Sequence, residues 1–133
     1  MILVDSSVWI DYFNGRATAE TEHLDNLLGV EPVALGDLIL TEVLQGFRRN
    51  KDYETAKELL TSLSVFDLLG TDRAIQCADN FRALRKKGIT VRKTADVIIA
   101  TFCISNDLPL LHCDKDFEPF HKHLRLRNAL THA

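Results

Sequence analysis

Hydrophobic residues in this chain follow two spacings that alternate along the sequence. Short continuous apolar runs are typical of strands buried on both faces, whereas apolar residues at every third or fourth position are typical of helices. Strands of this kind are predicted at residues 2–4, 32–35 and 109–112, the last ending in His112, and a further strand at 65–69, where Asp67 interrupts the apolar residues. The helical spacing covers residues 6–13, 17–29, 37–47, 52–64, 72–87 and 94–104. Strands that alternate with helices predict an α/β fold with a mostly parallel sheet.

Nothing in the pattern marks a boundary between domains. There is no linker, repeat or low-complexity segment, so we expect residues 1–133 to form one domain. Its residues are 46% hydrophobic and 26% charged, which is usual for a globular protein. Near the end of the chain, Leu124-Arg125-Leu126 predicts an additional edge strand.

One predicted helix, residues 94–104, is apolar on almost every side. A helix of this kind is typically buried all round. Asp96 lies in its first turn, and an ionised carboxylate in such a place is costly unless a partner offsets its charge. The pattern therefore raises the question of which cation Asp96 shares.

Other acids follow the ends of predicted strands. Asp5 comes directly after the first run, and Asp114 and Asp116 follow the last one. Functional sites of open α/β sheets lie beyond the carboxyl ends of the strands, an edge that Glu42 and Asp96 could also reach from their helices. Two carboxylates about 4 Å apart repel by roughly 4 kcal/mol at an effective dielectric constant of about 20. Such a group needs a proton or a divalent cation, and oxygen ligands favour Mg²⁺ or Mn²⁺ over zinc.

Each acid also has a purely structural interpretation. Asp5 could cap the helix that follows it, and Asp96 could be a first-turn acid favoured by the helix dipole. Glu42 could be a solvated residue on a helix face, while Asp114 and Asp116 could shape a turn before Phe117. Their joint position at the sheet edge and the apolar surroundings of Asp5 and Asp96 favour a metal site.

The remaining composition narrows the class of protein. The net charge of −3 argues against general binding of polyanions, so any such site must be a local patch or depend on a metal. Three cysteines without a CxxC pair suggest reduced thiols in the cytoplasm, and no signal peptide or membrane span is expected. His112, His121 and His123 could suggest zinc or a general base, but we interpret them as surface residues.

Four segments in order resemble a known family. They read ILVDSSVWIDYF at residues 2–13, TEVLQGFR at 41–48, TADVIIATFCI at 94–104 and LLHCDKDF at 110–117. Together they resemble a PIN domain and, more narrowly, the VapC toxins of bacterial toxin–antitoxin pairs. The resemblance runs from Met1 to about Leu126. It implies a three-layer α/β/α fold and endoribonuclease activity that depends on Mg²⁺ or Mn²⁺.

The resemblance also implies roles for individual residues. Asp5 and Asp96 would be the principal metal ligands, Glu42 would bind the metal or a water, and Asp114 would complete the cluster. The other matching positions are Asp116, a further acid, and Ser7 or less surely Ser6, the hydroxyl that steadies the cluster. Many members have a threonine and a basic residue where this chain has His112-Cys113. That departure leaves the division of roles between Asp114 and Asp116 open.

The partners implied are RNA, of the tRNA or rRNA class, a small cognate antitoxin and a second copy of the chain. Candidates for holding RNA phosphates are Arg48, Arg49, Arg85, Lys86, Arg92 and Lys93. Basic residues at a helix end such as Lys86 could instead only complement the helix dipole. The apolar side chains of Trp9, Tyr12, Phe13 and Phe47 exceed what one small core needs, which favours a homodimer.

Two rival functions come from other classes. A receiver domain also gathers acids at a parallel sheet, but this chain lacks a convincing phospho-accepting aspartate on a central strand with its partner lysine. A catalytically silent PIN-like binding module would not need all four acids. Binding of Mn²⁺ together with RNA cleavage would separate an enzyme from such a module.

Overall fold

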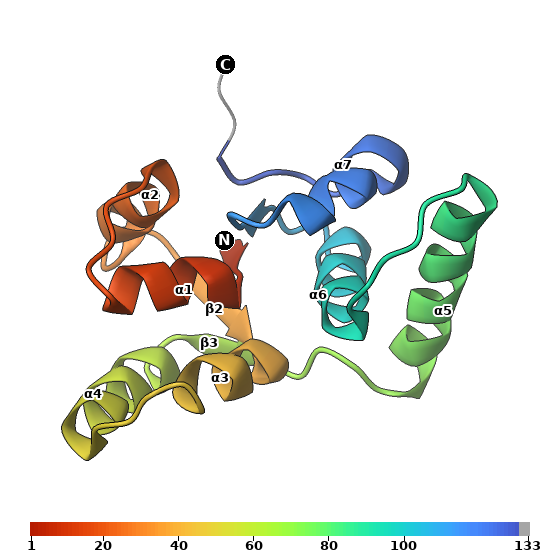
Figure 1. Ribbon diagram of the computed structural model, residues 1–133. Coiled ribbons are helices and arrows are strands. Elements are labelled where there is room, and N and C mark those ends of the chain that lie inside the picture. Colours follow the sequence, from red (N-terminus) through yellow and green to blue (C-terminus); the bar gives the residue numbers. More distant parts are fainter. Residues whose placement is uncertain (131–133) are drawn as a thin grey trace.

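The computed structural model describes residues 1–130 of the chain, and its centre is a parallel sheet (Figure 1). The strands are β1 (Ile2–Val4), β2 (Val33–Gly36), β3 (Ser64–Phe66) and β4 (Leu110–Leu111). They lie in the order β3-β2-β1-β4, and every pairing is parallel. Leu3 is opposite Ala34 on one side and Leu110 on the other, and all three side chains are fully buried. The predicted α/β fold with a parallel sheet is thereby confirmed.

The helices form two groups on opposite sides of the strands (Figure 1). The first group contains α1 (Ser6–Phe13), α2 (Ala19–Leu27), α3 (Asp37–Leu44) and α4 (Asn50–Thr61). The second contains α5 (Thr71–Lys86), α6 (Thr94–Ser105) and α7 (Glu118–Leu124), with the short 3₁₀ helix η1 (Lys115–Phe117) before α7. Within residues 1–130, no helix is both long and apolar enough to cross a membrane.

Helix α6 is the most buried of these elements, as its all-round apolar pattern predicted. Seven of its twelve residues are buried, and α5 covers its outer side. Its polar Thr101 is satisfied because Asn80 of α5 donates a hydrogen bond of 3.0 Å to the threonine hydroxyl. The first turn of α6, with Asp96, is therefore held firmly against the end of the sheet.

The connection from β2 into α3 is equally constrained. Gly36 ends the strand, and a Cβ atom at this position would overlap the side chain of Leu68. The chain then enters α3 at once, where Asp37 accepts hydrogen bonds from the backbone amides of Leu38 (2.8 Å) and Leu68 (3.2 Å). This junction fixes the helix that carries Glu42.

Two sequence predictions are wrong. The segment from Leu124 to Leu126 is not an edge strand, because α7 continues to Leu124 and Arg125 adopts a left-handed conformation with φ of 64°. This turn buries Leu126, and the described backbone after α7 meets the sheet in an isolated parallel bridge between Asn128 and Leu110. Trp9 is also among the apolar side chains predicted to exceed what the core needs. It belongs to the core instead, since its side chain is fully buried and packs on Phe13.

Candidate metal centre at the carboxyl edge of the sheet

Asp5 links the end of β1 to the start of α1. Its backbone amide donates to the carbonyl of Leu111 at the end of β4 (2.9 Å). Its carboxylate Oδ2 accepts from the amide (3.1 Å) and the hydroxyl (2.6 Å) of Ser7, so Asp5 does cap α1. Burial raises the pKa of Asp5, an effect that the bonds from Ser7 oppose and the charge of Asp114 reinforces.

Asp96 and Glu42 reach the same edge from helices on opposite sides of the sheet. Asp96 is only 6% exposed, and its Oδ2 has no hydrogen-bond partner among the described residues. Burial and then the charge of Asp5 raise the pKa of Asp96 to about 7. The same two causes raise the pKa of Glu42, whose buried Oε1 also lacks a partner within residues 1–130.

Asp114 and Asp116 complete the group from the segment after β4. Asp114 caps η1, because its Oδ1 accepts from the amide of Asp116 (2.9 Å). One carboxylate oxygen from each of Asp96, Asp114 and Asp116 lies within 4.8 Å of the other two. The structure thus brings Asp114 and Asp116 to the edge where Asp5 and Asp96 interact.

Lys93 is the cation that contacts this group. It directly precedes α6, and its Nζ lies 3.5 Å from Oδ2 of Asp114. The charges of Asp96 and then Asp114 raise the pKa of Lys93, whose charge in turn opposes the increase at Glu42 and Asp96. Since the pKa values of both acids are still raised, one ammonium does not offset the accumulated negative charge.

The chemistry of these residues fits a divalent cation. A buried oxygen without a partner costs about 1–3 kcal/mol, and Asp96 and Glu42 each have one. A hard cation such as Mg²⁺ or Mn²⁺ prefers oxygen ligands, so it would bind the oxygen of Asp96 and would reach that of Glu42 directly or through a bound water. Its charge would also offset the mutual repulsion of the acids. Acidic side chains supply only oxygen, which disfavours zinc relative to a site with cysteine or histidine.

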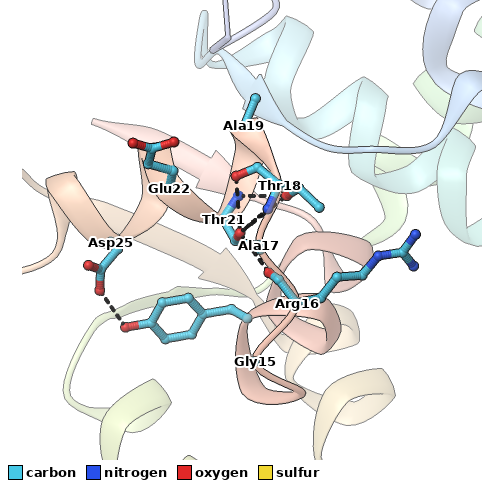
Figure 2. A pocket seen from close by; sticks show the side chains of 9 residues that line it. Gly15, Arg16, Ala17, Thr18, Ala19, Thr21, Glu22 and Asp25 are labelled. Carbon is cyan, nitrogen blue, oxygen red and sulfur yellow. Dashed lines mark hydrogen bonds between the residues drawn. The ribbon is translucent and has the colours of Figure 1, made fainter.

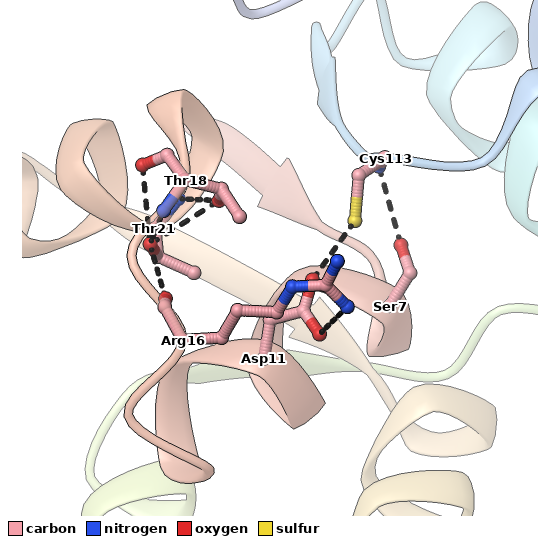
Figure 3. Close-up of polar contacts among 6 residues, drawn as sticks. All are labelled: Ser7, Asp11, Arg16, Thr18, Thr21 and Cys113. Atoms are coloured by element: carbon pink, nitrogen blue, oxygen red, sulfur yellow. Dashed lines mark hydrogen bonds and ion pairs between the residues drawn. The ribbon is translucent and has the colours of Figure 1, made fainter.

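Ser7 joins the two strand ends that carry the acids. Its hydroxyl donates to Asp5 and accepts from the backbone amide of Cys113 (3.3 Å) (Figure 3). The thiol of Cys113 donates to Asp11 (3.5 Å), and Asp11 forms a long ion pair of 3.9 Å with Arg16. Ser6 is the first residue of α1, and its hydroxyl opposes the raised pKa of Glu42.

Most of the predicted phosphate-binding residues lie apart from this contact network. Arg48 and Arg49 line a cavity of about 480 Å³ between α1 and the start of α4. Arg85 lies over the ring of Phe81, 5.5 Å from its centroid, beside an apolar groove between α5 and α6. The remaining two, Lys86 and Arg92, are exposed. Among the six candidates, Lys93 alone forms an ion pair with an acid of the site in the described chain.

The interpretation of all three histidines as surface residues is wrong for His112. This residue is only 8% exposed, and its Nε2 lies 2.8 Å from Nε2 of His121. The sequence holds a signal that could have revealed it, since His112 directly follows the buried residues Leu110 and Leu111.

Comparisons with known proteins agree with this arrangement. The family model of the PIN domain matches residues 2–122. The chain is 32% identical over 123 residues to "VapC ribonuclease Mb1587" of Mycobacterium bovis, which covers 89% of this chain and 90% of that protein. It has the same identity and coverage with "Ribonuclease VapC11" of Mycobacterium tuberculosis.

Solved structures of similar fold include VapBC2 from Rickettsia felis bound to a DNA fragment from its promoter. The TM-score is 0.73 at 16% identity, with 96% of this chain and 97% of that chain covered. VapC20 from Mycobacterium tuberculosis, described as a sarcin-ricin loop cleaving toxin, has a TM-score of 0.64 at 18% identity, with 89% and 93% covered. At these identities the likeness supports the fold alone.

Proposed function

This chain belongs to the PIN-domain family, and on that premise we propose that it is an endoribonuclease, the toxin of a toxin–antitoxin pair, that works with Mg²⁺ or Mn²⁺. The observation that supports the metal most strongly is the pair of buried oxygens without partners, Oδ2 of Asp96 and Oε1 of Glu42, next to Asp5. The reaction is hydrolysis of an RNA phosphodiester bond by water, without a covalent intermediate on the protein.

The acids divide the work according to their surroundings. Asp5 and Asp96 would hold the cation, because both are buried at the edge and their charges interact. Asp114, with Asp116 beside it, completes the ligand set from the other side. When bound, the cation polarises a phosphoryl oxygen and makes water more acidic. Glu42, whose pKa is raised, accepts the proton of the attacking water at Oε1.

Lys93 changes its partner during this cycle. Its side chain is 60% exposed, and among the described residues its ion pair is with Asp114. If Asp114 holds a cation, the ammonium of Lys93 would be available to contact a non-bridging oxygen of the scissile phosphate. Ser7 keeps its bonds to Asp5 and to the amide of Cys113 throughout, so the two strand ends stay together.

The proposed partners are an RNA of the tRNA or rRNA class, a small antitoxin and a second copy of the chain. Support for the antitoxin comes from the toxin–antitoxin complexes among proteins of similar fold. Support for the homodimer comes from the exposed side chain of Leu69, which lines the apolar groove between α5 and α6, and from that of Ile75, which is exposed on α5. Light scattering at tens of micromolar should give the mass of a dimer, and a monomer would contradict this part of the proposal.

The activity is tested with purified protein and total cellular RNA. Cleavage should require added Mn²⁺ or Mg²⁺, stop with a chelator and return when the ion is restored. Sequencing of the RNA ends would identify the substrate and the cleaved bond. Cleavage that persists in chelator would overturn the metal-dependent mechanism, and binding of RNA without cleavage would favour a catalytically silent binding module.

A further inference from the structure

Two histidines meet behind the acidic edge. His112 follows β4, and His121 lies on α7 with its Nε2 2.8 Å from Nε2 of His112. The ring centroids are 5.0 Å apart and the ring planes differ by 18°, so the rings are joined edge to edge rather than face to face. The ring of His112 also packs on Phe117 of η1 at 4.8 Å.

The bond partners determine where the protons lie. Nδ1 of His112 lies 3.2 Å from the backbone amide of Asp114, which can only donate, so this nitrogen carries a lone pair. A neutral His112 therefore carries its proton on Nε2. Nδ1 of His121 lies 2.8 Å from the carbonyl of Leu126, which can only accept, so this nitrogen carries the proton.

These assignments give a chain of hydrogen bonds that runs in one direction. The amide of Asp114 donates to His112, His112 donates through Nε2 to Nε2 of His121, and His121 donates through Nδ1 to Leu126. Each proton has one acceptor, so the arrangement suits two neutral rings.

The pair does not have the chemistry of a metal site, although one atom from each of His112, Glu118 and His121 lies within 4.8 Å of the other two. A ligating histidine binds through an unprotonated nitrogen and donates its other N–H to an acceptor. His121 could do so, because its Nδ1 faces a carbonyl. His112 could not, because the nitrogen that faces the cluster carries the proton and the other one accepts from an amide.

The bond from Asp114 to His112 belongs to a tightly held turn. The amide of Cys113 donates to Ser7, the amide of Asp114 donates to His112, and the amide of Asp116 donates to Asp114 itself. Three side chains thus fix three of the four amides between Cys113 and Asp116, in the segment that carries the fourth acid. Of these side chains, His112 is the one that ties the turn to α7.

We propose that His112, held by its hydrogen bond to His121, is a positioning residue that orients Asp114 toward the metal centre. This inference rests on the proposed function, because it gives Asp114 a role in binding the cation. It also means that α7 and the following residues, through Leu126, support the site although none of them is an acid of it.

Three variants and a control test the proposal by calorimetry with Mn²⁺. His112→Phe keeps a ring but loses the acceptor, and the affinity for Mn²⁺ should fall about 10- to 100-fold, as is usual when a group that orients a ligand is lost. His112→Asn should recover to within about 3-fold of the wild type, because an asparagine oxygen can accept from the amide two residues later. His121→Phe should lie between them. His123→Phe should match the wild type, because His123 lies on the same helix but its side chain forms no hydrogen bond within residues 1–130.

A second measurement needs neither the metal nor RNA. Nitrogen-15 spectra of the imidazole rings in the metal-free protein should show His112 protonated at Nε2 and His121 at Nδ1. Because this result is independent of activity, it separates a failure of the inference from a failure of the proposed function. Thermal unfolding followed by circular dichroism would reveal whether His112→Phe folds. If it does not, the nitrogen-15 spectra of the wild type still test the proposal.

Several results would overturn the proposal. They are the opposite protonation of either ring, wild-type affinity for Mn²⁺ in folded His112→Phe, and failure of His112→Asn to recover. Stoichiometric binding of Zn²⁺ that is lost in His121→Phe would show that the pair is itself a metal site.

Discussion

Two polar clusters of this molecule each contain a polar side chain that is buried to the same extent. The clusters differ in whether the hydrogen bonds of that side chain are satisfied. Thr21 and Asp96 are each 6% exposed. In the turn between α1 and α2, the hydroxyl of Thr21 donates to the carbonyl of Arg16 (2.9 Å) and accepts from the amide of Thr18 (2.9 Å) (Figure 2). The hydroxyl of Thr18 accepts from the amide of Thr21 in return (3.0 Å). Oδ2 of Asp96, by contrast, has no partner among residues 1–130.

The difference supports the proposal that the cluster of Thr21 serves the fold and the cluster of Asp96 serves chemistry. A satisfied buried group contributes about 1 kcal/mol to stability, whereas an unsatisfied one costs about 1–3 kcal/mol. A cavity of about 610 Å³ lies at the satisfied turn, lined by residues that include Tyr12 and Asp25, and none of its lining residues is an acid of the proposed metal centre. The unsatisfied oxygens of Asp96 and Glu42, rather than this cavity, support the proposed place of the metal centre.

The largest effect is expected when the charge of Asp96 is removed. Asp96→Asn keeps the shape of the side chain but weakens cation binding, so RNA cleavage should fall by about two to three orders of magnitude. The free energy of unfolding of the metal-free protein should stay the same or rise by up to about 2 kcal/mol, because repulsion with Asp5 is relieved. Urea unfolding and a cleavage assay on the same preparation measure both.

Asp72→Asn is the matched control, since Asp72 lies in the first turn of α5 as Asp96 does in that of α6, but is exposed. It should lose only the interaction with the helix dipole, about 0.5 kcal/mol, and keep full cleavage. If Asp96→Asn unfolds the protein while specific activity per folded molecule is intact, Asp96 is a structural residue and the metal centre is wrongly placed.

The second effect concerns pH and the metal-free protein. Asp96 titrates near 3.8 when unfolded and at about 7 when folded, so the folded state holds a proton that the unfolded state has lost. Its contribution to stability is complete below pH 4 and disappears as the pH rises through 7. Stability should therefore fall between about pH 4 and 7, by on the order of 1 to 2 kcal/mol because water at the edge screens part of the effect.

In Asp96→Asn the free energy of unfolding should depend less on pH. His112, whose lowered pKa acts in the opposite direction, contributes equally to both proteins, so its effect cancels when the two free energies are subtracted. Affinity for Mn²⁺ should change the other way and rise with pH, by up to about 10-fold per unit below pH 7, because binding displaces the proton. Calorimetry in buffers of different ionisation enthalpy would detect the released proton. Binding without proton release from pH 5 to 8 would show that the acids do not act as one cluster.

The fold and the place of the acids could be predicted from the sequence because both depend on the backbone. Continuous apolar runs define parallel strands, and parallel strands put Asp5 and the segment of Asp114 at one edge whatever the side chains do. Periodicity likewise places Asp96 in the first turn of a buried helix. The structure agrees on each of these points.

The contacts that tune the edge could not be predicted in the same way. The bond between His112 and His121 depends on the orientation of two rings and on a left-handed residue, Arg125, that ends α7. The spacing of apolar residues does not encode such a turn. For the same reason, the predicted edge strand at residues 124–126 was wrong. The ion pair of Lys93 with Asp114 depends on one rotamer of a long side chain, so it could not be predicted from the sequence either.

The smallest effect is expected at the satisfied cluster. Thr21→Val keeps the shape of the side chain but leaves the amide of Thr18 and the carbonyl of Arg16 without their partner, so the protein should lose about 1–2 kcal/mol of stability. Cleavage and affinity for Mn²⁺ should not change, because the lost bonds belong to the start of α2 and not to the acidic edge. Urea unfolding would measure the stability, and calorimetry the affinity for Mn²⁺. Thr61→Val is the control, because Thr61 is exposed and its hydroxyl donates to the carbonyl of Lys57 within α4. A loss of Mn²⁺ affinity in folded Thr21→Val would mean that the network from Arg16 through Asp11 to Cys113 connects the two clusters, and the division between them would then fail.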